Sequence, residues 1–116
     1  TTSTTSTSVY ATGISLTWSD LPDGTYDITL VGSLLAAHST SAGVNIGVDC
    51  GGSVSANAGV SCPTGANPFT RIERNFTFSD VAVAGGITIK TVYKCASTGT
   101  ASVVNPCLQA FAKRKA

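Results

Sequence analysis

Hydrophobic and polar residues alternate with a period of two along most of this chain of 116 residues. Ile14, Leu16 and Trp18 alternate with serine and threonine, for example, and no helical period of any length is present. Because successive side chains of a strand point to opposite faces, this pattern predicts half-buried strands. Long strands are expected at 9–19, 25–35, 43–49, 70–79, 87–95 and 107–113, and a short one at 53–60 is left open. Strands separated by frequent turn signals are typical of an all-β sandwich or jelly roll.

Several of these strands carry apolar residues on both faces. Val31 directly follows Leu30, and Val92 directly precedes Tyr93, so in each pair one apolar side chain points to each face. Phe111 likewise points to the face opposite that of Leu108 and Ala110. A sandwich strand normally shows one apolar face. A second apolar face with few charges indicates a contact between subunits, and burying it would also help a small domain to gain stability. We therefore expect an oligomer.

Composition narrows the class of protein further. Hydrophobic residues make up 42% of the chain and charged residues 11%, and the net charge is +1. The 31 Ser and Thr residues outnumber the 13 charged residues. A near-neutral chain lacks the basic face of a nucleic-acid binder, and it is too apolar for disorder. No apolar run is long enough to insert in a membrane as a helix. We expect a polar stalk end or linker at 1–8 (TTSTTSTS) and one domain at 9–116.

The residues that perform acid–base chemistry are scarce, because the chain has one His and one Glu. His38 stands among Ser39, Thr40 and Ser41, but a catalytic triad also needs an acidic partner and an oxyanion hole, and no GxSxG is present. We predict no enzyme, no cofactor and no metal site. A small secreted hydrolase remains an alternative.

The four cysteines form two sets with equal spacing. The pairs Cys50–Cys62 and Cys95–Cys107 are favoured among the three possible pairings, because each closes a short local loop that a disulfide would stabilise by roughly 3 kcal/mol. Disulfides would place the protein outside the cytosol, at a cell surface or in the periplasm. Four reduced, buried thiols are the alternative.

A family resemblance rests on the ordered whole of the chain. The run Ile14-x-Leu16-x-Trp18-x-x-Leu21-Pro22-x-Gly24-x-Tyr26-x-Ile28 is similar to the opening of trimeric globular tips of phage and bacterial fibres. The closing half, from Phe76-x-Phe78 to the last strand Cys107–Phe111, resembles a tumour-necrosis-factor-like or complement-globular-head-like jelly roll. The resemblance implies a homotrimer on a stalk that binds a cell-surface glycan or envelope receptor. It fits a bacterial surface fibre, including that of a predatory bacterium, or a phage tail fibre.

The resemblance also implies that both termini lie near the stalk. With six long strands, turn 20–24 and loops 50–69 and 96–106 then meet at the distal end, while loops 36–42 and 80–86 lie near the stalk. Rigid loops suit binding because less ordering entropy is lost on contact. A full-length strand at 53–60 would make the count odd and overturn this placement.

Candidate ligand-binding residues follow from these loops. Carboxylates can accept hydrogen bonds from sugar hydroxyls or hold Ca²⁺, and amides beside an aromatic ring suit a sugar. Each candidate residue can also be explained as an ordinary turn, loop or core residue. Trp18 could also stack on a sugar, but its alternation with Ile14 and Leu16 favours a position in the core. The candidates are Asp20, Asp23, Asn57, Asn67, Phe69 and Arg71.

Three functions are therefore weighed. The first is a non-enzymatic adhesin, the homotrimeric jelly-roll tip of a fibre that recognises a target-cell envelope. The second is a structural cap that trimerises a fibre and binds no ligand. The third is the hydrolase named above.

Overall fold

The structure, a computed structural model, describes residues 2–40, 43–57, 60–62 and 69–115. Within these ranges the chain forms strands and no helix, and therefore no helix that could cross a membrane. The strands are β1 (Thr2–Thr4), β2 (Ala11–Trp18), β3 (Gly24–His38), β4 (Gly43–Cys50), β5 (Ser53–Ala56), β6 (Val60–Ser61), β7 (Thr70–Val83), β8 (Ile87–Cys95) and β9 (Ala101–Arg114).

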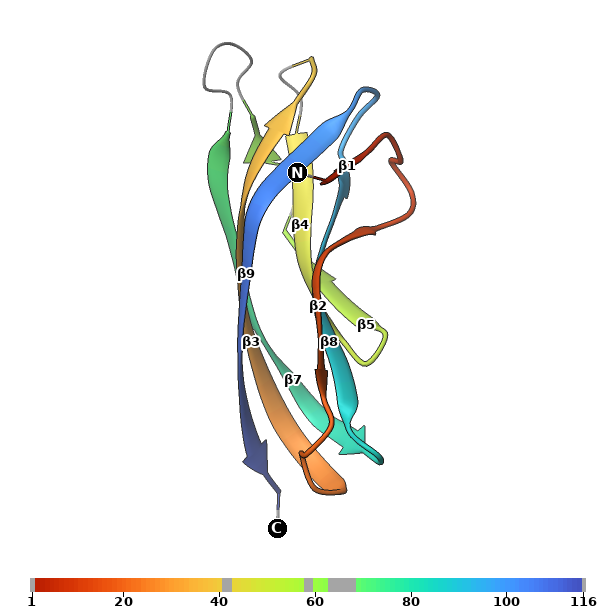
Figure 1. Cartoon of the computed structure of the whole chain (residues 1–116), viewed down its shortest axis with the longest axis vertical. Coiled ribbons are helices and arrows are strands. Elements are labelled where there is room, and N and C mark those ends of the chain that lie inside the picture. The colour runs from red at the N-terminus through yellow and green to blue at the C-terminus, as the bar shows by residue number, and fades with distance from the viewer. Residues whose placement is uncertain (1, 41–42, 58–59, 63–68, 116) are drawn as a thin grey trace.

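The strands form two antiparallel sheets that pack face to face (Figure 1). Sheet 1 has the order β1-β9-β3-β7, and sheet 2 has the order β2-β8-β4-β5, with β6 paired to β4 above β5. The molecule is elongated, with principal extents of 50 × 22 × 18 Å. The prediction of an all-β fold with two packed sheets is confirmed.

The core lies between the sheets and follows the predicted alternation. Every second residue of β3 and β4 is buried, which gives two apolar clusters along the long axis. One cluster surrounds Tyr93, and the other surrounds Ile28 and Leu30. Side chains of small volume allow the layers to approach closely, as at Gly32, where an added Cβ would lie 2.9 Å from Val48.

Three strands, β3, β7 and β9, are longer than the sequence predicted, and in β7 and β9 bulges absorb residues that would break a regular ladder. In β7, Ser79 and Asp80 stand opposite Asp27 alone, and Asp80 has a φ of 56°. In β9, Asn105 (φ 51°) and Pro106 form a second bulge opposite Leu34. A bulge accommodates an extra residue and a proline, which cannot donate to the ladder. Segments expected to be a turn and a loop therefore continue as strand.

The predicted grouping of loops is wrong. The turn before Gly24 and the β7–β8 turn lie at one end of the sandwich, here called the Gly24 end, and the β4–β5 turn lies nearer to this end than to the other (Figure 1). The β3–β4 and β8–β9 connections lie at the other, the His38 end, where His38 pairs with Ala101. The cause is the return through β5 and β6, which makes the number of strand crossings odd. Loop 96–106 is thus far from turn 20–24, and β5 and β6 run from the Gly24 end toward the His38 end.

The two termini also lie at opposite ends, contrary to expectation. Thr2 pairs with Val103 near the His38 end, and Arg114 pairs with Tyr26 near the Gly24 end (Figure 1). Thr2–Thr4, inside the segment expected to be a stalk end or linker, is an edge strand of sheet 1. The segment is also held by Cys95, whose backbone N–H donates to the Ser6 carbonyl at 2.9 Å.

The predicted disulfide pairs are not formed. Cys50 lies at one end of β4, while Ser61, the neighbour of Cys62, pairs with Gly43 at its other end. Because each residue of a strand adds about 3.3 Å, the two ends of β4 are roughly 20 Å apart. The Cα atoms of disulfide-bonded cysteines lie within about 7 Å of each other.

The second pair is separated by a whole layer. Cys95 is buried in the core from sheet 2, while the Cys107 side chain is exposed on the outer side of sheet 1. The argument for an extracellular location that rested on these two disulfides therefore loses its support.

Candidate binding groove

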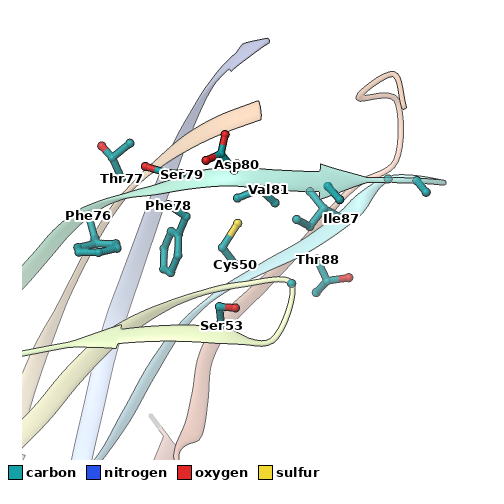
Figure 2. A pocket seen from close by; sticks show the side chains of 14 residues that line it. Cys50, Ser53, Phe76, Thr77, Phe78, Ser79, Asp80, Val81, Ile87 and Thr88 are labelled. Carbon is teal, nitrogen blue, oxygen red and sulfur yellow. The ribbon is translucent and has the colours of Figure 1, made fainter. Parts of the chain in front are cut away.

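A groove of about 960 Å³ opens at the Gly24 end, between β7 and the turn that joins β4 to β5 (Figure 2). It exists because β5 is short and leaves the sandwich open beside the last half of β7. Aromatic and aliphatic side chains line it together with several hydroxyl groups. The main lining residues are Cys50, Ser53, Phe76, Thr77, Phe78, Ser79, Asp80, Val81, Ile87 and Thr88.

Cys50 lies in the groove between Phe78 and Ile87 (Figure 2). Burial and, to a smaller extent, the neighbouring Asp49 carboxylate together raise the pKa of the Cys50 thiol to about 11. A nucleophilic cysteine needs a lowered pKa, because the thiolate is the reactive form. Cys50 is therefore an apolar wall of the groove, and its environment opposes nucleophilic chemistry.

The aromatic wall of the groove comes from β7. Phe76 and Phe78 both point into the space between the sheets and meet edge to face, with ring centroids 4.9 Å apart. The Arg74 guanidinium lies 5.3 Å from the centre of the Phe76 ring. Phe76 is nevertheless 39% exposed, because no strand covers it at this height. The groove thus presents an aromatic ring that is held in place but accessible.

The acidic group of the groove is neutralised by a lysine. The Lys115 ammonium lies 2.7 Å from the Asp80 carboxylate and 3.7 Å from the Asp27 carboxylate. The hydrogen bond to Asp80 and the charges of both carboxylates raise the pKa of Lys115, which stays protonated at neutral pH. No other lining residue named for the groove carries a formal charge, so the groove favours an uncharged ligand.

The upper part of the β7 edge is closed by side chains from the β5 region. The Asn57 amide donates to the Glu73 carbonyl at 2.6 Å. Arg74 in turn donates to the Asn57 amide oxygen at 3.1 Å and to the Ser55 hydroxyl at 2.6 Å. This cluster, here called the Asn57 clasp, joins the two sheets just above the groove.

The predicted tip residues Asp20 and Asp23 lie at the Gly24 end, away from the other candidates. Asp23 accepts a hydrogen bond from the Gly85 backbone N–H at 2.9 Å, and its own carbonyl accepts one from Arg114. Its carboxylate therefore ties the β2–β3 turn to the β7–β8 turn. Asp20 is exposed in the β2–β3 turn.

Two of the remaining predicted residues come together at Glu73. Asn57 binds its carbonyl, and Arg71 forms an exposed ion pair of 3.1 Å with its carboxylate. Arg71 also donates to the Ser33 hydroxyl, so it lies on the outer side of sheet 1. Phe69 is 39% exposed just before β7, and Asn67 lies outside the described residues. The structure thus splits the described candidates: Asp20 and Asp23 share the β2–β3 turn, and Asn57 and Arg71 meet at Glu73.

Trp18 and His38 occupy structural positions. Trp18 is half-buried and lines a smaller apolar cleft of about 330 Å³ with Leu16, Ile89 and Ala110, where β2 and β9 leave the sandwich open. His38 is 2% exposed; its Nδ1 accepts from the Thr40 backbone N–H, and its Nε2 lies 3.3 Å from the Ser97 carbonyl. His38 therefore joins two connections at its end of the molecule.

Sequence reasoning missed the groove residues Cys50, Phe76 and Asp80. Phe76 shares the parity of the buried Ile72 and Phe78, so its alternation predicts a core position. The available signal was Gly51-Gly52, a turn directly after β4, which makes β5 a short returning strand. A short β5 predicted from this turn would have left the edge of β7 uncovered.

A second feature is the outer side of β3 and β9, here called the sheet 1 face. It is formed by uncharged side chains that alternate with the core positions. They are Thr29, Val31, Ser33, Leu35 and Ala37 on β3, and Val104, Cys107, Gln109 and Phe111 on β9. Phe111 is 60% exposed, and charge appears only toward the margins, at Asp27 opposite Lys113 and at Arg71 and Glu73.

Among the described residues, no three His, Cys, Asp or Glu side chains are grouped so that they could hold a metal ion. No family model, no curated protein and no solved structure matches this chain. Its function is therefore inferred from its own geometry.

Proposed function

We propose that this chain is the non-enzymatic recognition head of a homotrimeric surface fibre, built as a jelly roll. The topology supports the proposal when β5 and β6, which both pair with β4, are counted as one returning strand. The first strand then pairs with the eighth, the second with the seventh, the third with the sixth and the fourth with the fifth. One long hairpin wound into two sheets is the arrangement of a jelly roll.

The observation that carries the proposal is the sheet 1 face. An exposed phenylalanine beside a row of uncharged side chains is typical of a protein interface. The apolar cleft at Leu16 and Trp18 offers a second apolar surface on a different side of the molecule. When a projecting group and a receiving cleft lie on different patches, copies associate head to tail and can close into a ring. A homotrimer is the small ring that the family resemblance implies.

Recognition without catalysis is supported by the chemistry of the groove. Its exposed ring and the Ser53 hydroxyl offer an apolar surface and a hydrogen bond to an uncharged ligand, while the Asp80 carboxylate is paired with Lys115. Cys50 has a raised pKa, and the His38 ring is buried against backbone groups. On this proposal the ligand is a glycan or an envelope receptor of a target cell, and the fibre belongs to a bacterial surface or to a phage tail.

Assembly is tested by light scattering of the purified chain. The proposal expects a mass three times the 11.7 kDa of one chain. A monomeric mass across the concentration range would contradict the trimer.

Recognition is tested by applying the labelled trimer to an array of bacterial surface glycans and to whole cell envelopes. Binding that saturates supports a recognition head. A stable trimer that binds neither glycans nor envelopes would instead support the structural cap, which assembles a fibre and has no ligand.

A further inference from the structure

We propose that the open part of the β7 edge captures an extended, uncharged segment of a partner polypeptide as an additional strand of sheet 1. This inference deepens the proposed function, because it names the way in which the head would hold a protein receptor. Addition of a strand to a sheet edge uses backbone hydrogen bonds for affinity and pockets for alternate side chains.

The first step is the direction of the backbone groups of β7. The Glu73 carbonyl accepts from the Asn57 side chain at 2.6 Å, so it points away from β3 and toward the edge. In an antiparallel strand the N–H and C=O of every second residue point to the same edge. The β3–β7 register is regular from Thr70 to Phe78. Asn75 and Thr77 therefore also present their backbone N–H and C=O to this edge.

The second step is that this edge is open only over a short stretch. Above it, the Asn57 clasp covers Glu73 and shows that an amide donor fits there. Below it, the bulge at Ser79 and Asp80 interrupts the ladder. Between these limits Asn75, Phe76 and Thr77 are all exposed, although successive residues face opposite sides of the sheet. The open stretch therefore suits a few residues of extended chain.

The third step is the groove beneath this stretch. A strand beside Asn75 and Thr77 would direct every second side chain into the groove, toward Phe76, Phe78 and Cys50. Apolar side chains of moderate size match that wall. The other side chains would lie level with Thr77, whose hydroxyl is 2.8 Å from the Thr29 hydroxyl. The pattern expected in the partner is an alternation of apolar residues with hydroxyl residues.

The fourth step is charge complementarity. The groove has one carboxylate among its named lining residues, Asp80, and Lys115 lies 2.7 Å from it. A charged side chain entering the groove would lose hydration without an ion partner, which is costly. An uncharged segment meets no such cost, so the occupant is a neutral strand.

The test uses a short fluorescent peptide in which threonine and valine alternate between terminal lysines. Fluorescence anisotropy with the natural chain is expected to show saturable binding. The same peptide with N-methyl groups on alternate backbone nitrogens should lose at least tenfold in affinity, because it cannot donate to one edge. No binding of the unmethylated peptide at millimolar concentration would overturn the inference.

The matched variants are Thr77→Pro and Thr77→Val. Proline at this position removes a backbone donor that points to the open edge, and edge strands tolerate such a change. Both substitutions remove the Thr77 hydroxyl, but valine keeps the backbone N–H. We expect Thr77→Pro to lose at least tenfold in peptide affinity with unchanged circular dichroism, and Thr77→Val to bind at least tenfold more tightly than Thr77→Pro. Equal binding by folded Thr77→Pro would overturn the inference.

Failure of this inference is distinct from failure of the proposed function. If a glycan found on the array competes for the groove, and its binding is lost in Phe76→Ala but kept in Thr77→Pro, the occupant is a glycan. That result overturns the added strand and leaves the recognition head intact. Loss of the trimeric mass and of all envelope binding would overturn the proposed function itself.

Discussion

The outer faces of the two sheets differ in how far an outward-pointing apolar side chain is exposed to solvent. On sheet 1, Phe111 is 60% exposed; it lies between Gln109 and Lys113 on the outer side of β9 and opposite Thr29. On sheet 2, Val92 also points outward, but it is 3% exposed between Lys90 and Lys94 on the same strand. Long lysine side chains cover apolar surface with their methylene groups while their ammonium groups stay in water.

This difference shows which face is complete by itself. Lys90 stands opposite Asp49, and the Lys94 ammonium lies 4.6 Å from the centre of the Tyr10 ring, so the centre of the outer face of sheet 2 is covered within one chain, while Val54 on the edge strand β5 is 41% exposed. On the sheet 1 face Ser33 and Ala37 are likewise buried, at 7% and 8% exposed, whereas Phe111 stays exposed although Lys113 follows it on the same face. An apolar residue of the outward parity therefore indicates an interface only where its own neighbours do not bury it.

The largest effect is expected from Phe111→Asp, which replaces the exposed aromatic ring of the sheet 1 face by a charge. Burying an unpaired carboxylate in an interface is strongly unfavourable. We expect the mass by light scattering to fall from three chains to one while the circular dichroism spectrum stays that of a β protein. Ser15→Asp, on the outer face of sheet 2, is the control and should keep the mass of the natural chain.

The next effect concerns Cys107, which the proposed trimer would cover. With iodoacetamide at pH 8, peptide mapping should show Cys107 reacting at least tenfold more slowly in the natural chain than in Phe111→Asp. Cys50 is the internal reference: because its pKa is raised to about 11, it should react slowly in both proteins. Its thiolate fraction, and so its rate, should rise as the pH approaches 11. Equal Cys107 rates in the two proteins would argue that this face is not covered.

A smaller effect is expected from Gly32→Ala, which disturbs the packing between the two sheets. The new Cβ would lie 2.9 Å from Val48 Cγ1 and 3.0 Å from Thr91 Cγ2, so it would push the sheets apart. Overpacking of this kind costs about 1–3 kcal/mol in the free energy of unfolding. Urea unfolding should show that loss, and Thr25→Ala, exposed on the same strand, should show little. An unchanged midpoint for Gly32→Ala would mean that the layers are less closely packed than described.

The smallest effect is expected from replacing the lysines of sheet 2 in the double variant Lys90→Thr and Lys94→Thr. The change removes the contact between Lys94 and Tyr10, which is worth about 0.5–1 kcal/mol, and uncovers Val92. We expect the urea midpoint to fall slightly and the mass of the assembly to remain unchanged. A fall in mass would reverse the assignment of the two faces.

The strands were predictable because alternation is a local property. The core positions of β3, such as Ile28, Leu30 and Leu34, follow directly from the period of two. The extensions of β7 and β9 were not, because Asp80 and Asn105 adopt positive φ values that only the neighbouring strand β3 makes favourable. Bulges depend on a partner strand, and a single sequence does not display that partner.

The candidate site was harder to predict because it depends on the direction of each strand. Counting the returning segment 53–61 as part of a loop placed Asp23 beside Asn57, whereas the structure places them on different parts of the molecule. Equal spacing of cysteines was similarly misleading, since Cys50 and Cys62 lie at opposite ends of β4. Short separation in sequence does not mean proximity in space when the intervening residues form a strand.

The bulge at Asn105 and Pro106 has a consequence for aggregation. β1 covers only the first residues of β9, and below them β9 is the margin of sheet 1. A strand from another molecule that tried to extend along this margin would meet a proline without an N–H and a local kink, so fibril-like growth would stop there. One margin of the sheet is thus protected against uncontrolled stacking, while the margin at Thr77 has no proline to prevent pairing.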